Sequence, residues 1–419
     1  MIRQRDRNLH VVREQEDPTD RIVREILDEL NSEDSMQQKQ QKQEMQNRKR
    51  RKMQRKLAAG VLALLLAMGG AYLFVNLQTY GSVQVTDTWR GEGTSGGSYR
   101  EFAGGILKFS RDGVSYLDQK GEEQWNHPYQ IKNPFVDVGE VSAAVADKGG
   151  NDIFVIQKDG VKGEIHTAMP VERVSISRQG IVGAILKNDT SATVMCYDMV
   201  GNVLVEHKTS SSGTGYPLDI ALSGDGKVMQ VLYFFTQGGR ITSKVIYYNF
   251  GEAGEGRTDN QVSSSEYEDT VMAAGFFLNE SASAAVGDNC LVIYQGKETP
   301  REVKRIAIDK EIRSVFNNKN YIGLILKNEG KEGHELRLYN ADGKVVITKD
   351  FTGDYSNVKL CGRQVILYGG RQCSIFMRNG IQKFDGEMDS DILEIFPVMG
   401  INRYIVISAD GIEKIRLVK

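Results

Sequence analysis

The chain contains few of the residues that build metal centres: five His and four Cys occur among its 419 residues. It has no H-E-x-x-H, C-x-x-C or EF-hand pattern, in which the spacing of the ligands brings them around one ion. After residue 77 it carries 38 Lys or Arg against 44 Asp or Glu, without the basic excess typical of nucleic-acid-binding proteins. These absences predict no metal site and no nucleic-acid partner.

The four cysteines do not resemble a disulfide framework. Cys196, Cys290 and Cys373 each fall inside a separate strand-like run, and only Cys361 and Cys373 are close in sequence. A disulfide needs Cα atoms within about 7 Å of each other. We therefore expect free, mostly buried thiols, with a Cys361–Cys373 bridge as the alternative.

Residues 57–77, LAAGVLALLLAMGGAYLFVNL, contain no charged side chain. About 20 apolar residues are enough for a helix to span the hydrocarbon core of a membrane. Residues 48–56, directly before this run, include seven Lys or Arg, and cationic side chains resist translocation. The pattern predicts a single uncleaved transmembrane helix, with the N-terminus in the cytoplasm and the C-terminal part outside the cell membrane. The alternative is a signal peptide, although its apolar core normally follows a much shorter segment.

The predicted cytoplasmic tail, residues 1–56, contains one amphipathic stretch at 20–31. Ile22, Ile26 and Leu30 recur every four residues and would form one apolar stripe on a helix of about three turns. Such a helix is marginal alone in water, so it needs a cytoplasmic partner, a second copy or the membrane surface. A solvated tail is the alternative interpretation.

Small residues recur every four positions along the predicted membrane helix, at Ala59, Ala63, Ala67 and Ala71. This spacing lets two membrane helices approach closely, which favours self-association. Ala is also common in plain anchors, so a monomeric anchor is the other interpretation.

Residues 99–419 show short apolar or alternating runs between Gly, Asp and Asn turns, a pattern typical of many short strands. A strand–turn–strand unit repeats, and one turn glycine from each unit gives intervals of 39, 41, 50, 45, 47, 37 and 31 residues, about 41 on average. The glycines are Gly121, Gly160, Gly201, Gly251, Gly296, Gly343, Gly380 and Gly411. This period is typical of four-stranded propeller blades. We predict an all-β propeller of eight blades, with seven as the alternative.

The two ends of the propeller predict how its ring closes. The last unit offers only three strands, whereas Val83 and Val85 alternate with polar residues in SVQVTDT (82–88). We expect this run to be the outer strand of the final blade, because closure removes a loose sheet edge. Residues 78–98 are therefore the closing strand and a Gly-rich linker. Pro134, Pro170 and Pro217 are expected at the entrances to first strands, where a missing N–H is harmless.

Two short segments resemble known propeller repeats. ALSGDGK (221–227) is similar to the S-x-D-G-K turn of WD-type and TolB-type propellers, and LDQKGEEQW (117–125) resembles the outer hairpin of pyrroloquinoline-quinone-type propellers. The whole layout resembles an uncharacterised family of bacterial, clostridial-type single-pass membrane proteins with a propeller of unknown function. This resemblance implies the fold and no known activity or cofactor.

No residue pattern assigns a catalytic, cofactor-binding or metal-binding residue. Residues 93–97 formally match G-x-S-x-G, but the nucleophile elbow needs a preceding strand and a following helix. Residues 251–256 are Gly-rich without a helix N-terminus to hold phosphate. His127 and His166 are expected just after the outer strands of adjacent blades. One interpretation is that they line one rim together, and the favoured one is that they are exposed turn residues.

We therefore expect a membrane-anchored extracytoplasmic binding or scaffold protein that recognises an envelope protein, peptide or glycan without catalysis. Two alternatives remain: a transmembrane sensor that couples ectodomain binding to the helix at 20–31, and a membrane-tethered quinoprotein-like or hydrolytic enzyme. The expected partners are membrane lipid, an unknown envelope protein or glycan, a cytoplasmic protein at 20–31 and a second copy through the membrane helix.

Overall fold

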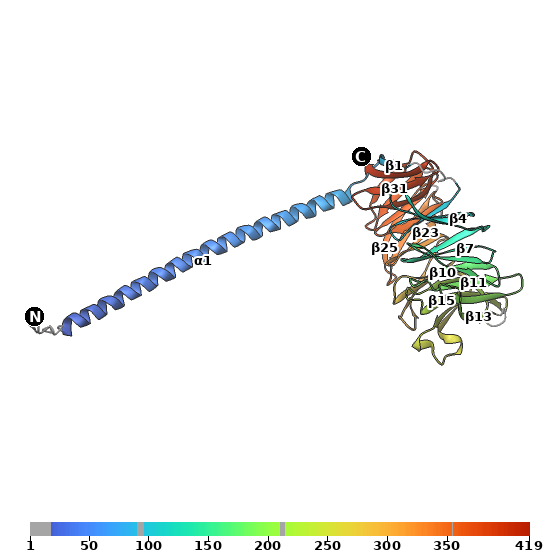
Figure 1. Ribbon diagram of the computed structural model, residues 1–419, viewed down its shortest axis with the longest axis horizontal. Coiled ribbons are helices and arrows are strands. Elements are labelled where there is room, and N and C mark those ends of the chain that lie inside the picture. The colour runs from blue at the N-terminus through green and yellow to red at the C-terminus, as the bar shows by residue number, and fades with distance from the viewer. Residues whose placement is uncertain (1–17, 90–95, 210–213, 354) are drawn as a thin grey trace, which may run out of the picture. The chain divides into compact units, whose positions relative to one another are not determined.

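The computed structural model describes residues 18–419 apart from residues 90–95, 210–213 and 354. It contains one long helix, α1 (Pro18–Leu77), and a separate unit of β-strands (Figure 1). The stretches expected at 20–31 and 57–77 are parts of this one uninterrupted helix. Among the described residues, Arg48–Phe74 is the one segment long and apolar enough to span a membrane. Its large apolar side chains, including Leu62 and Leu66, are exposed.

The β unit is a propeller of eight four-stranded antiparallel sheets, so eight blades are confirmed and seven is wrong. Blades 1 to 4 are β2 (Ser98–Phe102), β3 (Gly105–Phe109), β4 (Gly113–Leu117) and β5 (Glu123–Pro128); β6 (Pro134–Val138), β7 (Ser142–Asp147), β8 (Asp152–Gln157) and β9 (Gly160–His166); β10 (Val171–Ile176), β11 (Val182–Lys187), β12 (Ala192–Tyr197) and β13 (Val203–Lys208); and β14 (Tyr216–Leu222), β15 (Val228–Gln237), β16 (Arg240–Asn249) and β17 (Gln261–Glu268).

Blades 5 to 8 follow in the same order around the ring. They are β18 (Met272–Phe277), β19 (Ala282–Gly287), β20 (Cys290–Gln295) and β21 (Arg301–Ala307); β22 (Ile312–Asn317), β23 (Tyr321–Lys327), β24 (His334–Asn340) and β25 (Val345–Phe351); β26 (Asn357–Cys361), β27 (Gln364–Gly369), β28 (Gln372–Met377) and β29 (Gln382–Glu387); and β30 (Ile392–Pro397), β31 (Arg403–Ser408), β32 (Gly411–Val418) and β1 (Ser82–Trp89). Two short 3-10 helices, η1 (Glu252–Gly254) and η2 (Thr258–Asn260), lie in the loop between β16 and β17.

The N-terminal strand closes the ring as the sequence predicts. β1 pairs antiparallel with β32, with Val83 opposite Leu417 and Val85 opposite Ile415. The first strand of the chain thereby becomes the fourth strand of blade 8, so the last sheet has no open edge at β32.

The core lies between neighbouring blades. Within the described residues, eight hydrophobic clusters each join one pair of neighbours around the ring. At the junction of blades 8 and 1, Tyr99 and Ile106 pack with Phe396 and Ile405, and all four are nearly inaccessible to solvent. A single blade cannot bury both faces of its sheet, so the ring is the cooperative unit.

The first strand of each blade, which lies nearest the axis, carries local features that fit this position. Pro134 opens β6, Pro170 directly precedes β10 and Pro217 is the second residue of β14, which confirms the three predicted entrances. Five of these inner strands, β10, β14, β18, β22 and β30, contain a β-bulge in their pairing with the second strand. Bulges bend and twist an inner strand next to the axis.

The turn that resembles S-x-D-G-K joins β14 to β15. The Ser223 hydroxyl donates to Asp225 Oδ1 over 2.7 Å and accepts the Val228 N–H over 2.9 Å. Gly226 has a φ of +69°, in the left-handed region that favours glycine. The residue types of this motif therefore form one compact turn between the first two strands of a blade.

All four cysteines are unpaired, and the Cys361–Cys373 alternative is wrong. Cys361 ends β26 and Cys373 lies in β28, with β27 between them. Their partners on β27, Gln364 and Tyr368, are four residues apart. Two strand spacings of about 4.8 Å and an offset of about 13 Å separate the thiols far beyond bonding range. Burial also raises the pKa of Cys361 to about 12, which makes its thiol a poor nucleophile.

Candidate functional site

The axis of the propeller is lined by the first strands of the blades, whose axis-facing edges have no further strand to pair with. Directly after β10, Ser177 donates its N–H to Ile181 within the blade, so the N–H of Ile176, the last residue of β10, faces the axis. An unpaired N–H in a protein interior costs free energy unless another acceptor reaches it. The chain supplies such acceptors from the neighbouring blade.

Two aspartates supply acceptors at the axis. Asp137 in β6 accepts the Ile176 N–H of blade 3 over 2.8 Å, and Asp219 in β14 accepts the Gly275 N–H of blade 5 over 2.8 Å. In each case the side chain of one blade binds the inner edge of the next, which aligns adjacent blades. Both residues are half-buried.

Ser175 in β10 makes the same kind of contact. Its hydroxyl accepts the Leu222 N–H of blade 4 over 3.0 Å. Blades 2, 3, 4 and 5 are therefore joined in sequence by Asp137, Ser175 and Asp219, each accepting one N–H from the following blade.

Enclosure at the axis raises the pKa of both carboxyl groups. Loss of solvation raises the pKa of Asp137 to about 6, although bonds from the backbone and from Ser175 oppose the rise. Loss of solvation likewise raises the pKa of Asp219 to about 6, and the nearby Arg173 opposes part of that rise. At neutral pH both groups are largely ionised, and each is more easily protonated than a surface aspartate.

A third buried acid, Glu394 in β30, lies on the opposite side of the axis and has different partners. Its carboxylate pairs with Lys359 of blade 7 and lies 3.5 Å from the Arg100 guanidinium of blade 1. It also accepts the Tyr368 hydroxyl over 3.2 Å and the Ile395 N–H over 2.9 Å. Cationic side chains therefore neutralise this acid, unlike the aspartates.

A cavity of about 920 Å³ occupies the channel and is lined by residues of blades 1 to 6. Its apolar lining includes Val174, Ile220, Phe276 and Val315, and Asp137, Asp219 and Glu101 supply charged groups. Its volume lies at the upper end of the range for small-molecule sites, and its lining is more polar than the mostly apolar wall that such sites usually have.

The mouth of the cavity is formed by loops between the first and second strands of the blades. We call this side of the propeller the AB face; its loops are residues 139–141, 177–181, 223–227, 278–281 and 318–320. Glu140 from blade 2 binds Arg178 of blade 3 over 2.8 Å and forms a second ion pair with Lys319 of blade 6. Blades 2 and 6 are four apart in a ring of eight, so the Glu140–Lys319 pair crosses the mouth.

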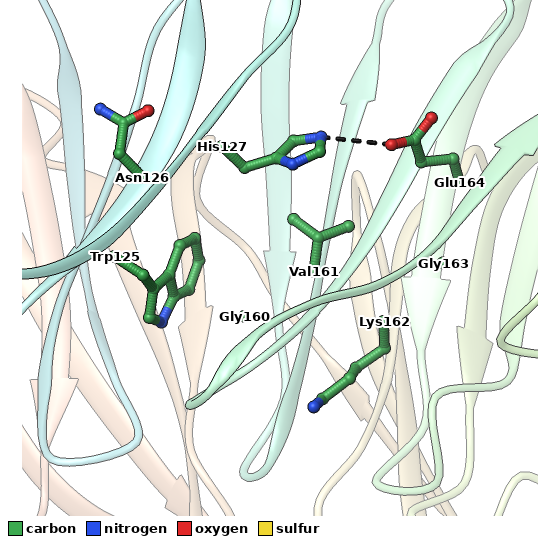
Figure 2. A pocket seen from close by; sticks show the side chains of 8 residues that line it. All are labelled: Trp125, Asn126, His127, Gly160, Val161, Lys162, Gly163 and Glu164. Atoms are coloured by element: carbon green, nitrogen blue, oxygen red, sulfur yellow. Dashed lines mark ion pairs between the residues drawn. The ribbon is translucent and has the colours of Figure 1, made fainter.

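A second, shallower hollow lies on the outside of the propeller, between β5 and β9, with a volume of about 350 Å³. Figure 2 shows the His127 ring directed toward Glu164, and the two groups are 3.2 Å apart. Trp125 Nε1 donates to the Lys158 carbonyl over 2.8 Å and its ring stacks on Tyr116. The His127–Glu164 and Trp125–Lys158 contacts join blades 1 and 2, which gives the outer hairpin at 117–125 a structural role.

The residues singled out by sequence do not form a site. His127 lies within β5 and His166 ends β9, so the prediction that they follow the outer strands is wrong. They have separate partners, Glu164 and Asp152. The matched G-x-S-x-G segment lies largely outside the described residues, and residues 251–256 form a loop with η1. Among the described residues, no group of three His, Cys, Asp or Glu could hold a metal ion.

The axial aspartates were not singled out by sequence reasoning. Each is the polar residue inside an otherwise apolar inner strand, as in PFVDV for Asp137 and YPLDIAL for Asp219. A buried polar residue in the first strand of a blade is the one available indication of a channel position.

Comparison with known proteins gives one family. The model of a family of unknown function, DUF5711, matches residues 76–417. No curated protein matches the chain. Sqt1 from Saccharomyces cerevisiae is similar in structure, with a TM-score of 0.53 and 10% identity over 80% of this chain and 100% of that one. BamB from Moraxella catarrhalis has a TM-score of 0.47 and 12% identity over the same shares. The likeness to Sqt1 supports the propeller fold alone.

Proposed function

The chain belongs to the DUF5711 family of unknown function, and we propose that it is a membrane-anchored extracytoplasmic protein that binds a partner without turnover. The observation that carries the proposal is the cavity of about 920 Å³ along the propeller axis, with its mouth on the AB face. The expected partner is a protein, peptide or glycan of the cell envelope.

The anchor is supported by the composition and exposure of α1. Arg48–Phe74 is long and apolar enough to cross a membrane, and its apolar side chains have no protein to cover them among the described residues. The cationic cluster at 48–56 favours a cytoplasmic N-terminus. Protease added outside intact cells should digest the propeller and spare residues 1–56, whereas digestion of the tail alone would contradict this orientation.

Binding at the mouth can be tested by crosslinking in intact cells. A photoreactive amino acid replaces Asn279, which lines the mouth, and in a matched variant it replaces Ser264 on the outer strand β17. We expect a defined envelope component to be captured from position 279 and not from position 264, and the purified component to bind the purified full chain. Equal capture from both positions, or substrate turnover by the purified chain, would overturn the proposal.

The unbroken course of α1 favours a second candidate function, that of a sensor. A continuous helix from Pro18 to Leu77 provides a direct mechanical connection between the tail and the membrane segment. Deletion of residues 1–47 should abolish a cellular response to ligand if the chain is a sensor, and should leave ligand binding unchanged. A response that survives the deletion would exclude this function.

A further inference from the structure

The charges that line the axial cavity are not balanced inside it. Glu101, Asp137 and Asp219 line the interior, whereas the lining cations, Arg178 and Lys319, lie at the mouth. Both of these cations are already paired with Glu140. Glu101 is exposed and has Lys359 as a nearby cation, so the half-buried Asp137 and Asp219 carry the negative charge that makes the cavity electrostatically complementary to a cationic ligand.

Other cations near the axis are already engaged elsewhere. Lys359 pairs with Glu394, which also attracts Arg100. Arg173, which lowers the pKa of Asp219, lies 3.3 Å from its neighbour Glu172. These contacts lower the net negative charge near the cavity without placing a cationic group among its lining residues.

The position of the Lys319 ammonium indicates which chemical group can bind at the mouth of the cavity. Its ammonium lies against the Glu140 carboxylate from the opposite side of the ring, and both side chains belong to exposed loops. A flexible four-carbon stem with a point charge fits this position because the stem tolerates apolar surroundings while the charge finds a carboxylate. An external alkylammonium would compete for the same carboxylate.

The wall of the cavity suits the same ligand. Phe276 and Phe277 line it together with Val174 and Ile220, and an aromatic face attracts an ammonium in addition to the carboxylates. The volume of about 920 Å³ is large enough for a lysine side chain and part of the chain that carries it.

We propose that the axial cavity binds a primary alkylammonium group, which enters by displacing Lys319 from Glu140 and is held by Asp137 and Asp219. The group is either a lysine side chain of a partner protein or a free polyamine. This inference rests on the proposed binding function and specifies its ligand. Lys319 then acts as an internal competitor that keeps the mouth closed until a stronger cation arrives.

The test measures binding by full-length protein in detergent at low ionic strength. The probes are the blocked peptide Gly-Gly-Lys-Gly-Gly, the same peptide acetylated on its lysine, and spermidine. We expect the unmodified peptide or spermidine to bind and the acetylated peptide not to bind. Binding of the peptide identifies a partner lysine, and binding of spermidine alone identifies a free polyamine. Absence of binding by both would overturn the inference.

Variants locate the site. Lys319→Gln should tighten binding between about twofold and fivefold, because it removes a competitor held by an exposed ion pair. Asp137→Asn with Asp219→Asn should weaken binding by about tenfold or more, because the asparagines keep the N–H acceptors and lose the charges. Lys331→Gln breaks an ion pair with Asp350 elsewhere on blade 6 and is the matched control, with no expected change.

Two outcomes separate this inference from the proposed function. If position 279 captures a partner while the ammonium probes do not bind, the binding function stands and the ligand assignment fails. If the Asp137 and Asp219 variants bind the probes as well as the native chain does, the ammonium site lies elsewhere. Circular dichroism of each variant confirms that the propeller is folded.

Discussion

The two sides of the propeller axis bury acidic side chains in different ways. On the side of blades 7, 8 and 1, Glu394 is 1% exposed and pairs with Lys359. On the side of blades 2 to 5, Asp137 and Asp219 are bound by backbone N–H groups of the following blade. The acid on the first side, Glu394, is neutralised by a cation of the protein. The acids on the second side, Asp137 and Asp219, have hydrogen-bond partners but no ion pair, and they line the cavity.

This difference separates structural from functional burial of charge. A buried ion pair is neutral and offers little to a ligand, and breaking it leaves an uncompensated charge. A carboxylate held by hydrogen bonds rather than by a paired cation is oriented by the fold and can still be neutralised by a cation that arrives from outside. The comparison assigns the first side of the axis to stability and the second side to binding.

The largest loss of stability should come from removing the cation that neutralises Glu394. Lys359→Met leaves Glu394 buried without its principal cation, and we expect the free energy of unfolding to fall by about 3 kcal/mol. Urea titration of the full chain in detergent measures this change through the fluorescence of Trp89 and Trp125, which both lie in the propeller.

Two controls make that result specific. Glu394→Gln in the same background should recover most of the loss, because Gln still accepts from Tyr368 and Ile395 and carries no charge. Lys331→Met, at a surface pair, should change stability by less than about 1 kcal/mol. Equal effects of Lys359→Met and Lys331→Met would remove the distinction between the two sides.

Removing the charge of Asp137 should instead raise the stability of the fold, and the size of this gain should depend on pH. The pKa of Asp137 is about 6 in the fold against 3.8 ordinarily, so the folded state binds the proton more tightly. The stability that protonation of Asp137 gives to the fold is fully present below pH 3.8 and is lost as the pH rises through 6. At pH 8 the ionised group costs about 3 kcal/mol.

Asp137→Asn should therefore stabilise the chain at pH 8, by up to about 3 kcal/mol, and change little at pH 4. The asparagine oxygen keeps the Ile176 N–H satisfied, so the comparison isolates the charge. Unfolding in urea at both pH values measures the difference. A variant less stable than the native chain at pH 8 would show that the carboxylate is compensated by a cation after all.

Much of the ring could be predicted from the spacing of its turns. Seven of the eight turn glycines lie in or beside the loop between the third and fourth strands, and Gly201 to Gly251 is the longest interval because β15 and β16 have ten residues each. Gly411 is different, since it follows the turn between β31 and β32. The last interval of 31 residues is therefore not a blade repeat, although the count of eight blades is right.

The candidate site could not be predicted in the same way. Asp137 and Asp219 belong to different blades, and Glu140 meets Lys319 from across the ring. Periodicity places each residue in its own blade, but the meeting of opposite loops depends on how many blades close the ring and on their loop lengths. The continuity of α1 could not be decided from sequence either, because residues 35–47, between the apolar stripe and the membrane segment, are compatible with a flexible or a helical spacer.

The smallest effect is expected at the mouth, where the Glu140–Lys319 pair joins exposed side chains. Each of Glu140→Gln and Lys319→Gln should change the free energy of unfolding by less than about 1 kcal/mol, because solvent and side-chain entropy reduce the value of exposed pairs. A double-mutant cycle should nevertheless give a coupling of about 0.2–1 kcal/mol at low salt, which disappears near 1 M NaCl as the Debye length falls to about 3 Å. Since the two residues lie on opposite blades, any coupling requires a direct contact across the mouth. A coupling that is zero at low salt would leave the mouth open and remove Lys319 as a competitor, while the buried pair of Glu394 with Lys359 would be unaffected.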